Sequence, residues 1–259
     1  MKKNLYKNRV TMIVYWVLRG LVLLSMIRAL VRGEYQSVFL CALSLVLMVL
    51  PSLLSRKLNL HLPVGLEVVI LLFIFAAEIL GEINSFYVKV PHWDTMLHTI
   101  NGFLCAAVGF TLVDLLNRDE RFSVQLSPLY LALTAFCFSL TVGVLWEFFE
   151  YGADLLLGTD MQKDMVVNAI HSVSLDQTMT NTAVHVTQIA DVIIVHSDGT
   201  QQALGLGGYL DVGNSDTMKD LLVNLIGAVI FSVIGYIAAS RKKESRIAAQ
   251  FIPQVLPEK

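Results

Sequence analysis

The sequence predicts an all-α membrane protein: a bundle of six transmembrane helices with a small extracytoplasmic β-containing insert between helices five and six. Of its 259 residues, 55% are hydrophobic and 15% are charged, whereas soluble domains have roughly 45–50% apolar and about 25% charged residues. The mean hydropathy is +0.64. Six apolar runs each approach the ~20 residues that a spanning helix needs, and one long polar stretch separates the last two.

The predicted helices follow the apolar runs along the chain. The runs are Val10 to Ala29, Val38 to Leu54, Leu62 to Leu80, Thr95 to Leu116, Ser127 to Glu147 and Leu221 to Ala239. The first run is too long for a signal-peptide core and no small-residue cleavage site follows it, so we expect a retained helix. Arg19 lies in the middle of this run and is expected to snorkel or to pair with another helix for structural reasons, with a role in the site as the alternative. By domain, the prediction is helices one to five in 1–151, the insert in 152–215, helix six in 216–240 and a tail in 241–259.

The distribution of Lys and Arg predicts the orientation in a bacterial plasma membrane. With both termini in the cytoplasm, thirteen basic residues fall in cytoplasmic segments and five in outer segments, namely Arg28, Arg32, Lys89, Lys163 and Lys219. Such a bias is typical of membrane proteins that place their positive loops inside. The lipid bilayer is therefore an expected partner. Nucleic acid is not, because the net charge is −2 and gives no basic excess for phosphates.

The polar insert predicts a small flap of two or three strands. Thr187 to Val195 reads as a strand that leads into a turn at Asp198 and Gly199, because Asp-Gly is a strong hairpin signal. The tail from Phe251, with its two prolines, is expected to be unstructured. His171, His185 and His196 lie in the insert without metal-ligand spacing, so we expect solvated surface histidines.

Three predicted helices carry an oxygen-rich stripe at the same, outer end of the bundle. Spacings of three, four, seven or eight residues place the members of a stripe on one helix face. The stripes are Asp94, His98 and Asn101 in the fourth helix, Glu147, Glu150 and Asp154 in the fifth if it continues past Glu147, and Asp216, Asp220 and Asn224 in the sixth, with Glu78 and Glu82 as a further pair in the third. Ionisable residues at membrane depth are costly and indicate a functional site.

Several carboxylates cannot share a low-dielectric pocket unless something neutralises them. A divalent cation such as Mg²⁺, Mn²⁺ or Zn²⁺ could do so, with Asp94, His98, Glu147 and Asp220 as its ligands. Protons could do so in the relay of a proton- or cation-coupled transporter. Alternatively, each acid lies at the membrane boundary for structural reasons, since the helix dipole favours acids in a first turn.

In the metal interpretation, the catalytic group consists of Glu150, Asp216 and Lys219. Glu150 is the candidate general base, and Lys219 contacts a substrate phosphate or simply balances the charge of the nearby aspartates. The expected activity is metal-assisted chemistry on a lipid or cell-envelope substrate. A transporter is less favoured, because the cytoplasmic half of the last three helices offers few polar residues beyond Thr141 and Ser232. A third alternative is a non-enzymatic accessory protein that binds a partner through the insert.

These motifs resemble those of the YjdF-like family of bacterial inner-membrane proteins and, more distantly, of the VanZ-like group. The resemblance rests on Asp94-Thr95-Met96-Leu97-His98, Trp146-Glu147-Phe148-Phe149-Glu150, Gly158-Thr159-Asp160-Met161-Gln162 and Asp216-Thr217-Met218-Lys219-Asp220 with Asn224 and Gly227. It implies one constellation of Asp94, His98, Glu147, Glu150, Gln162, Asp216 and Asp220. The family pattern joins the Met-Gln pair to the Asp-Thr-Met motif by a short connection. Here 164–214 intervenes, which puts in question whether Gln162 reaches the helix ends.

Overall fold

The computed structural model describes residues 9–57, 60–118, 126–240 and 248–255. It contains six helical segments that are long and apolar enough to cross a membrane, which confirms the predicted fold class. The segments are Arg9–Arg32, Tyr35–Lys57, Val64–Ile83, Trp93–Asn117, Pro128–Leu157 and Asn214–Ser240. The fifth helix continues past Glu147, so Glu147, Glu150 and Asp154 do lie on one helix.

Two of the six segments are interrupted along their length. The second is divided into α2 (Tyr35–Leu47) and α3 (Leu50–Lys57), and Pro51, which has no N–H to donate back along the helix, explains the break. The third consists of α4 (Val64–Ile74) and the π-helical η1 (Phe75–Ile83), which contains Glu78 and Glu82. The other helices are α1 (Arg9–Arg32), α5 (Phe86–Lys89), α6 (Trp93–Arg118), α7 (Pro128–Leu157), α8 (Asn214–Ser240) and α9 (Ala248–Phe251).

The chain divides into two compact units. One consists of Met1–Gly143 and Asp220–Lys259, and the other of Val144–Lys219. We call them the bundle unit and the insert unit. The first part of α7 and most of α8 belong to the bundle unit, whereas the end of α7 and the start of α8 belong to the insert unit.

The core of the bundle unit is built where α6, α7 and α8 approach one another closely. Added at Gly102 on α6, a Cβ atom would lie 2.0 Å from the carbonyl oxygen of Asn224 on α8. At Gly227 on α8 it would lie 2.0 Å from the carbonyl oxygen of Thr99 on α6. Small residues let helix backbones approach in lipid, so these two glycines serve the packing of α6 against α8. Below this crossing, Phe103 and Phe110 pack edge-to-face against Phe231.

Arg19 finds its partner within its own helix. Its guanidinium donates a hydrogen bond to the Tyr15 hydroxyl one turn earlier and lies 5.2 Å from the centre of that ring. A cation over an aromatic face is stabilised by the ring quadrupole, so Arg19 has a structural partner, but on its own helix and not on another one.

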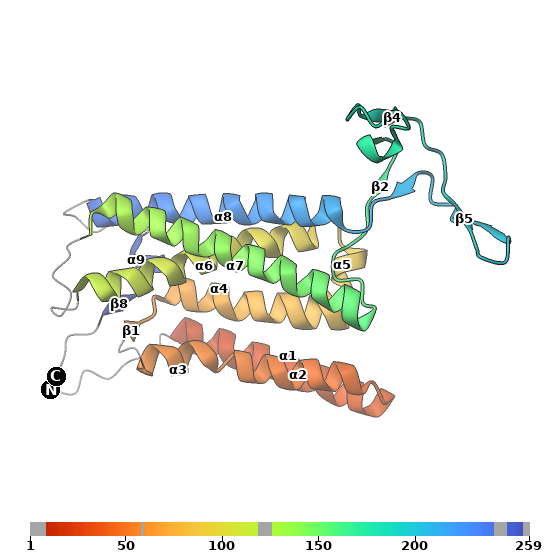
Figure 1. Ribbon diagram of the computed structural model, residues 1–259. Helices are drawn as coiled ribbons and strands as arrows, with labels where there is room; N and C mark the ends of the chain where they lie inside the picture. The colour runs from red at the N-terminus through yellow and green to blue at the C-terminus, as the bar shows by residue number, and fades with distance from the viewer. Residues whose placement is uncertain (1–8, 58–59, 119–125, 241–247, 256–259) are drawn as a thin grey trace, which may run out of the picture. The chain divides into compact units, whose positions relative to one another are not determined.

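Residues 248–255 include a short helix and a short strand, so the prediction of an unstructured tail from Phe251 was wrong for its described part, and 256–259 lie outside the described residues. β8 (Gln254–Val255) pairs antiparallel with β1 (Leu60–His61) in the bundle unit, as Figure 1 shows. Phe251 at the end of α9 packs edge-to-face against Phe103, with 5.3 Å between the ring centres. The apolar Phe251-Ile252 pair therefore anchors the tail to the core, a contact that composition alone did not reveal.

The insert unit contains short antiparallel strand pairs, which confirms the predicted β-containing insert, but the six strands among its described residues exceed the two or three expected. β2 (Val166–Val167) pairs with β7 (Tyr209–Leu210), β3 (Ile170–Ser172) with β4 (Val184–Val186), and β5 (Ile193–Val195) with β6 (Gln201–Ala203). A short 3-10 turn, η2 (Val173–Leu175), follows β3. The Asp198-Gly199 turn joins β5 to β6 as predicted, but β5 begins only at Ile193 and not at Thr187.

Candidate functional site

The bundle unit brings three predicted site residues together. His98 on α6 has its Nε2 3.5 Å from an Asp94 carboxylate oxygen one turn earlier and 3.9 Å from an Asp220 carboxylate oxygen on α8. Each residue offers a ligand atom within 4.8 Å of the other two. Asp220 is 1% exposed and His98 9%, whereas the side chain of Asp94 is 23% exposed. The cluster is thus buried at His98 and Asp220 and partly accessible at Asp94.

The glycine crossing explains why these side chains meet. His98 lies one turn before Gly102 on α6, and Asp220 lies two turns before Gly227 on α8. Because the two backbones touch at the glycines, side chains in the preceding turns of both helices face each other at short range. The packing of small residues therefore sets the spacing between His98 and Asp220.

A layer of amides lies one turn deeper. The Asn101 amide donates to the Asn224 side-chain oxygen at 3.4 Å, and the Asn224 amide donates to the Ser139 carbonyl at 3.4 Å. The Ser139 hydroxyl in turn donates to the Gly102 carbonyl at 2.8 Å. The side chain of Asn224 occupies the space left free by Gly143 on α7. Asn224 is only 1% exposed, so these bonds join α6, α7 and α8 by polar contacts where water cannot compete.

Beneath the amides the core becomes apolar. Its buried members include Ala106, Ala107, Phe110, Ala135, Ala228 and Phe231. The buried Thr111 hydroxyl donates a hydrogen bond to the Ala107 carbonyl of its own helix at 2.7 Å. Among the described residues of this layer, no chain of polar side chains therefore continues from the amides.

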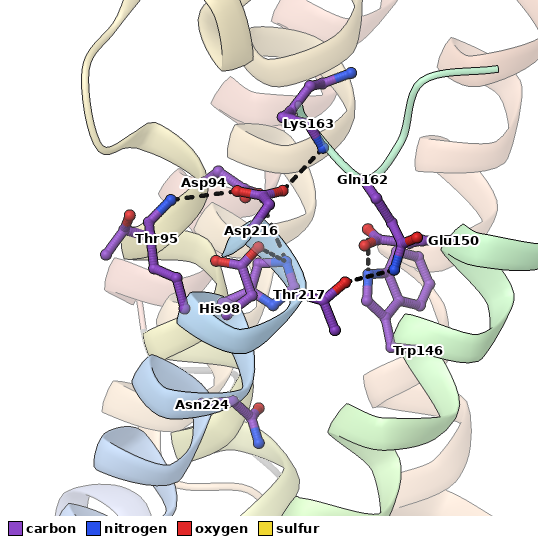
Figure 2. A network of polar contacts seen from close by, with 12 residues as sticks. Asp94, Thr95, His98, Trp146, Glu150, Gln162, Lys163, Asp216, Thr217 and Asn224 are labelled. Carbon is purple, nitrogen blue, oxygen red and sulfur yellow. Dashed lines mark hydrogen bonds and ion pairs between the residues drawn. The ribbon is translucent and has the colours of Figure 1, made fainter. Parts of the chain in front are cut away.

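The insert unit holds the other predicted acids. Glu147 and Glu150 lie on α7 and are 4% and 8% exposed. The indole N–H of Trp146 donates to a Glu150 carboxylate oxygen at 2.7 Å, one turn apart on the same helix (Figure 2). This hydrogen bond fixes the orientation of the Glu150 side chain.

Asp216 is also held within the insert unit. One of its carboxylate oxygens accepts the backbone N–H of Lys163 at 2.9 Å, and the other lies 3.4 Å from the Lys219 ammonium. Lys219 is thus a counter-charge to Asp216 in this structure, and its contact with a substrate phosphate stays a prediction. Figure 2 shows the Gln162 amide donating to the Thr217 hydroxyl beside this pair, at 2.6 Å.

Gln162 does reach the start of α8 despite the long insert. α7 ends at Leu157, and the next residue, Gly158, has a φ of +64°, a conformation that suits a glycine after a helix. The Asp154 carboxylate then accepts the backbone N–H groups of Met161 and Gln162 at 2.6 and 2.9 Å. At the base of the insert, β2 pairs with β7, and the Met165 N–H donates to Asp211 at 3.1 Å. The insert is thus a loop closed at its base.

Sequence reasoning therefore identified the principal acids but not all their partners. Ser139, Trp146 and Thr217 were missed as hydrogen-bonding residues; of these, the i, i+4 spacing of Trp146 and Glu150 was a signal that was available. Glu78 and Glu82 lie in η1, half-buried and exposed respectively. A single constellation that also includes Glu147, Glu150 and Asp216 stays a prediction.

Comparisons with known proteins define the family. The model of a family described as Predicted membrane protein (DUF2238) matches residues 13–241. An uncharacterized protein from Thermotoga maritima is 29% identical over 84 residues, which cover 32% of this chain and 41% of the relative. No solved structure matches the chain. The family match is consistent with the YjdF-like resemblance, and the matched range includes all the predicted site residues. Because the match covers most of the sequence, the chain belongs to the DUF2238 family of membrane proteins.

Proposed function

We propose that this membrane protein binds a divalent cation at Asp94, His98 and Asp220 and uses it for chemistry on a lipid or cell-envelope substrate. The observation that carries the proposal is the convergence of two carboxylates and an imidazole, from two helices, within 4.8 Å. Burying Asp220 and Asp94 close together is unfavourable unless a positive charge compensates them. A bound cation provides that charge.

The donor set favours a hard or borderline ion. Carboxylate oxygens suit Mg²⁺ and Mn²⁺, and one imidazole shifts the preference toward Mn²⁺ or Zn²⁺. When bound, such an ion polarises a phosphoryl or carbonyl oxygen and makes a coordinated water more acidic. The Asn101 and Asn224 amides, one turn deeper, fix α6 and α8 and thereby the angle between His98 and Asp220.

The place of the cluster within its helices suggests the substrate class. Asp94 and His98 lie in the first two turns of α6, which is long enough to cross a membrane. A site at the end of a spanning helix lies close to lipid headgroups. The partly exposed Asp94 provides access to it. The 13-to-5 distribution of basic residues supports an outward-facing site in a bacterial plasma membrane.

A proton- or cation-coupled transporter is the alternative, and the apolar layer weighs against it. A relay requires polar groups along a path. In the described part of the bundle unit, the hydrogen bonds of Asn101 and Asn224 extend only to the Cys105 thiol, to Ser139 and to the Gly102 carbonyl. Accumulation of protons or Mn²⁺ by proteoliposomes that depends on Asp220 would favour the transporter instead.

Mn²⁺ binding to the detergent-solubilised protein tests the metal site. We expect one tightly bound Mn²⁺ per chain in electron paramagnetic resonance titrations, with loss of binding in His98→Ala and Asp220→Asn. His196→Ala, which removes an exposed histidine of the β5–β6 turn, is the matched control and should bind as the wild type does. Wild-type protein without bound Mn²⁺, or His98→Ala with undiminished affinity, would refute the site.

The activity needs a separate assay. The purified protein is incubated with bacterial polar lipids and Mn²⁺, and the products are analysed by mass spectrometry. We expect conversion by the wild type and by His196→Ala, and none by His98→Ala. Metal binding without any conversion would retain the cation site but refute the proposed chemistry on lipid.

A further inference from the structure

We propose a second metal site, in the insert unit, formed by His171 and His185 and selective for a late first-row cation such as Cu²⁺ or Ni²⁺. The two histidines are fourteen residues apart in the sequence, and no short-range motif links them. The antiparallel register of β3 and β4 makes them direct cross-strand partners. Both histidines are exposed, as predicted, but their spacing in the sequence did not reveal that they face each other.

The geometry of the pair is that of two converging ligands. The Nδ1 atoms of His171 and His185 lie 2.7 Å apart, and the ring centres lie 4.6 Å apart. Without a metal, one ring must donate a proton and the other accept it, so the two rings need opposite tautomers. Two neutral rings with both Nδ1 lone pairs directed inward present a ready pair of donor atoms to a cation.

The separation indicates which cations fit. With metal–nitrogen distances of about 2.0–2.1 Å, two imidazole nitrogens on a tetrahedral Zn²⁺ lie about 3.3 Å apart. Adjacent nitrogens of a square-planar Cu²⁺ or Ni²⁺ lie about 2.9 Å apart. The observed 2.7 Å is closer to the square-planar value and requires only a small opening of the pair. Cu²⁺ also binds nitrogen ligands most tightly among these divalent ions.

The surroundings leave the pair available for a metal. Both rings are exposed, so water molecules can complete the coordination. Within the described part of the chain, neither ring is paired with a carboxylate. Neighbouring residues in the register, Ile170 with Val186 and Ser172 with Val184, carry no charge that competes for a cation.

Metal binding at this pair has a structural consequence. An isolated two-stranded hairpin is only marginally stable in water. A cation that bridges β3 and β4 binds the paired strands better than the separated strands, and so stabilises the hairpin by mass action. The site thereby makes the order of the β3–β4 hairpin depend on available metal.

Cu²⁺ titration of the full-length solubilised protein in a His98→Ala background tests the proposal, because that background removes the imidazole of the bundle-unit site. We expect one Cu²⁺ per chain, with an electron paramagnetic resonance signal showing coordination by two imidazole nitrogens. His171→Ala and His185→Ala should each weaken binding about tenfold or more, since each leaves a single ligand without its preorganised partner. The double variant should bind no more tightly than either single variant.

His196→Ala is the matched control and should leave Cu²⁺ binding unchanged. Amide hydrogen exchange in β3 and β4 should slow on addition of Cu²⁺ in the wild-type insert and stay unchanged in His171→Ala. Undiminished Cu²⁺ affinity in both single variants, or a signal with only one imidazole nitrogen, would refute the site. Neither result would affect the Mn²⁺ site at Asp94, His98 and Asp220.

Discussion

Substitution of Gly102 by alanine tests whether the glycine crossing creates the metal-binding geometry. The added Cβ would lie 2.0 Å from the Asn224 carbonyl oxygen, whereas an ordinary contact begins near 3.4 Å. The obstacle is a backbone carbonyl, which cannot rotate away as the end of a flexible side chain can. Relief therefore requires α6 and α8 to separate by about 1.4 Å, and overpacking of this kind costs about 1–3 kcal/mol of folding free energy.

The same separation acts on the metal ligands. His98 Nε2 and the Asp220 oxygen are 3.9 Å apart, and a cation about 2.1 Å from each ligand bridges at most about 4.2 Å. Opening by a further 1.4 Å places one ligand out of reach. We expect Gly102→Ala to lower the Mn²⁺ affinity about tenfold or more, as loss of ligand orientation does elsewhere.

The assay compares Gly102→Ala with Gly20→Ala by thermal unfolding and Mn²⁺ titration in detergent. A Cβ at Gly20 meets nothing within 4 Å, and alanine is favoured over glycine within a helix by about 1 kcal/mol. Gly20→Ala should thus be neutral or slightly stabilising and should retain full affinity. Wild-type Mn²⁺ affinity in Gly102→Ala would refute the reasoning that the crossing sets the site.

Two further predictions concern parts of the fold away from the metal ligands. Phe251→Ala should destabilise the protein by about 1–3 kcal/mol, because it removes the edge-to-face contact with Phe103. Thermal unfolding measures this loss, with the exposed Phe39→Ala as the control. Equal effects of the two substitutions would contradict the anchoring of the tail. The Thr178 hydroxyl and N–H groups hold the pKa of Asp176 well below its ordinary value of 3.8. Its contribution to stability is therefore present above pH 3.8 and lost only as pH falls through the lower folded pKa, so NMR titration should show Asp176 still ionised at about pH 3. Titration near 3.8 would contradict this, and Asp176→Asn should accelerate amide exchange at Thr180 at neutral pH.

The sequence predicted the helices well because membrane spans depend on local composition. Each spanning segment must satisfy its own backbone hydrogen bonds in lipid, so length and hydropathy alone identify it. The acidic stripes could also be predicted from the sequence, because residues three or four positions apart on a helix share a face. Asp94 and His98 follow from that rule without any knowledge of the neighbouring helices.

What the sequence did not reveal depends on contacts between distant segments. The His171–His185 pair exists only because β3 and β4 pair in one register, and a slip by one residue would direct the two rings to opposite faces. The anchoring of Phe251 depends likewise on Phe103, which lies far away in the sequence. Neither contact has a period or a motif, so composition and spacing could not predict it.

The closed base of the insert explains how a long insertion is compatible with the motifs on either side of it. β2 and β7 pair directly, and Met165 and Asp211 exchange hydrogen bonds at 3.0 and 3.1 Å. Asp211 also accepts the Ser215 N–H at the first turn of α8, which fixes the strand exit relative to the helix start. The chain therefore leaves and re-enters at neighbouring points, so Gln162 and Thr217 remain within hydrogen-bonding distance whatever the length of the loop. Loop length adds little entropic cost once the ends are joined. The hairpins beyond β2 and β7 are thus free to carry a function of their own, such as the proposed histidine site.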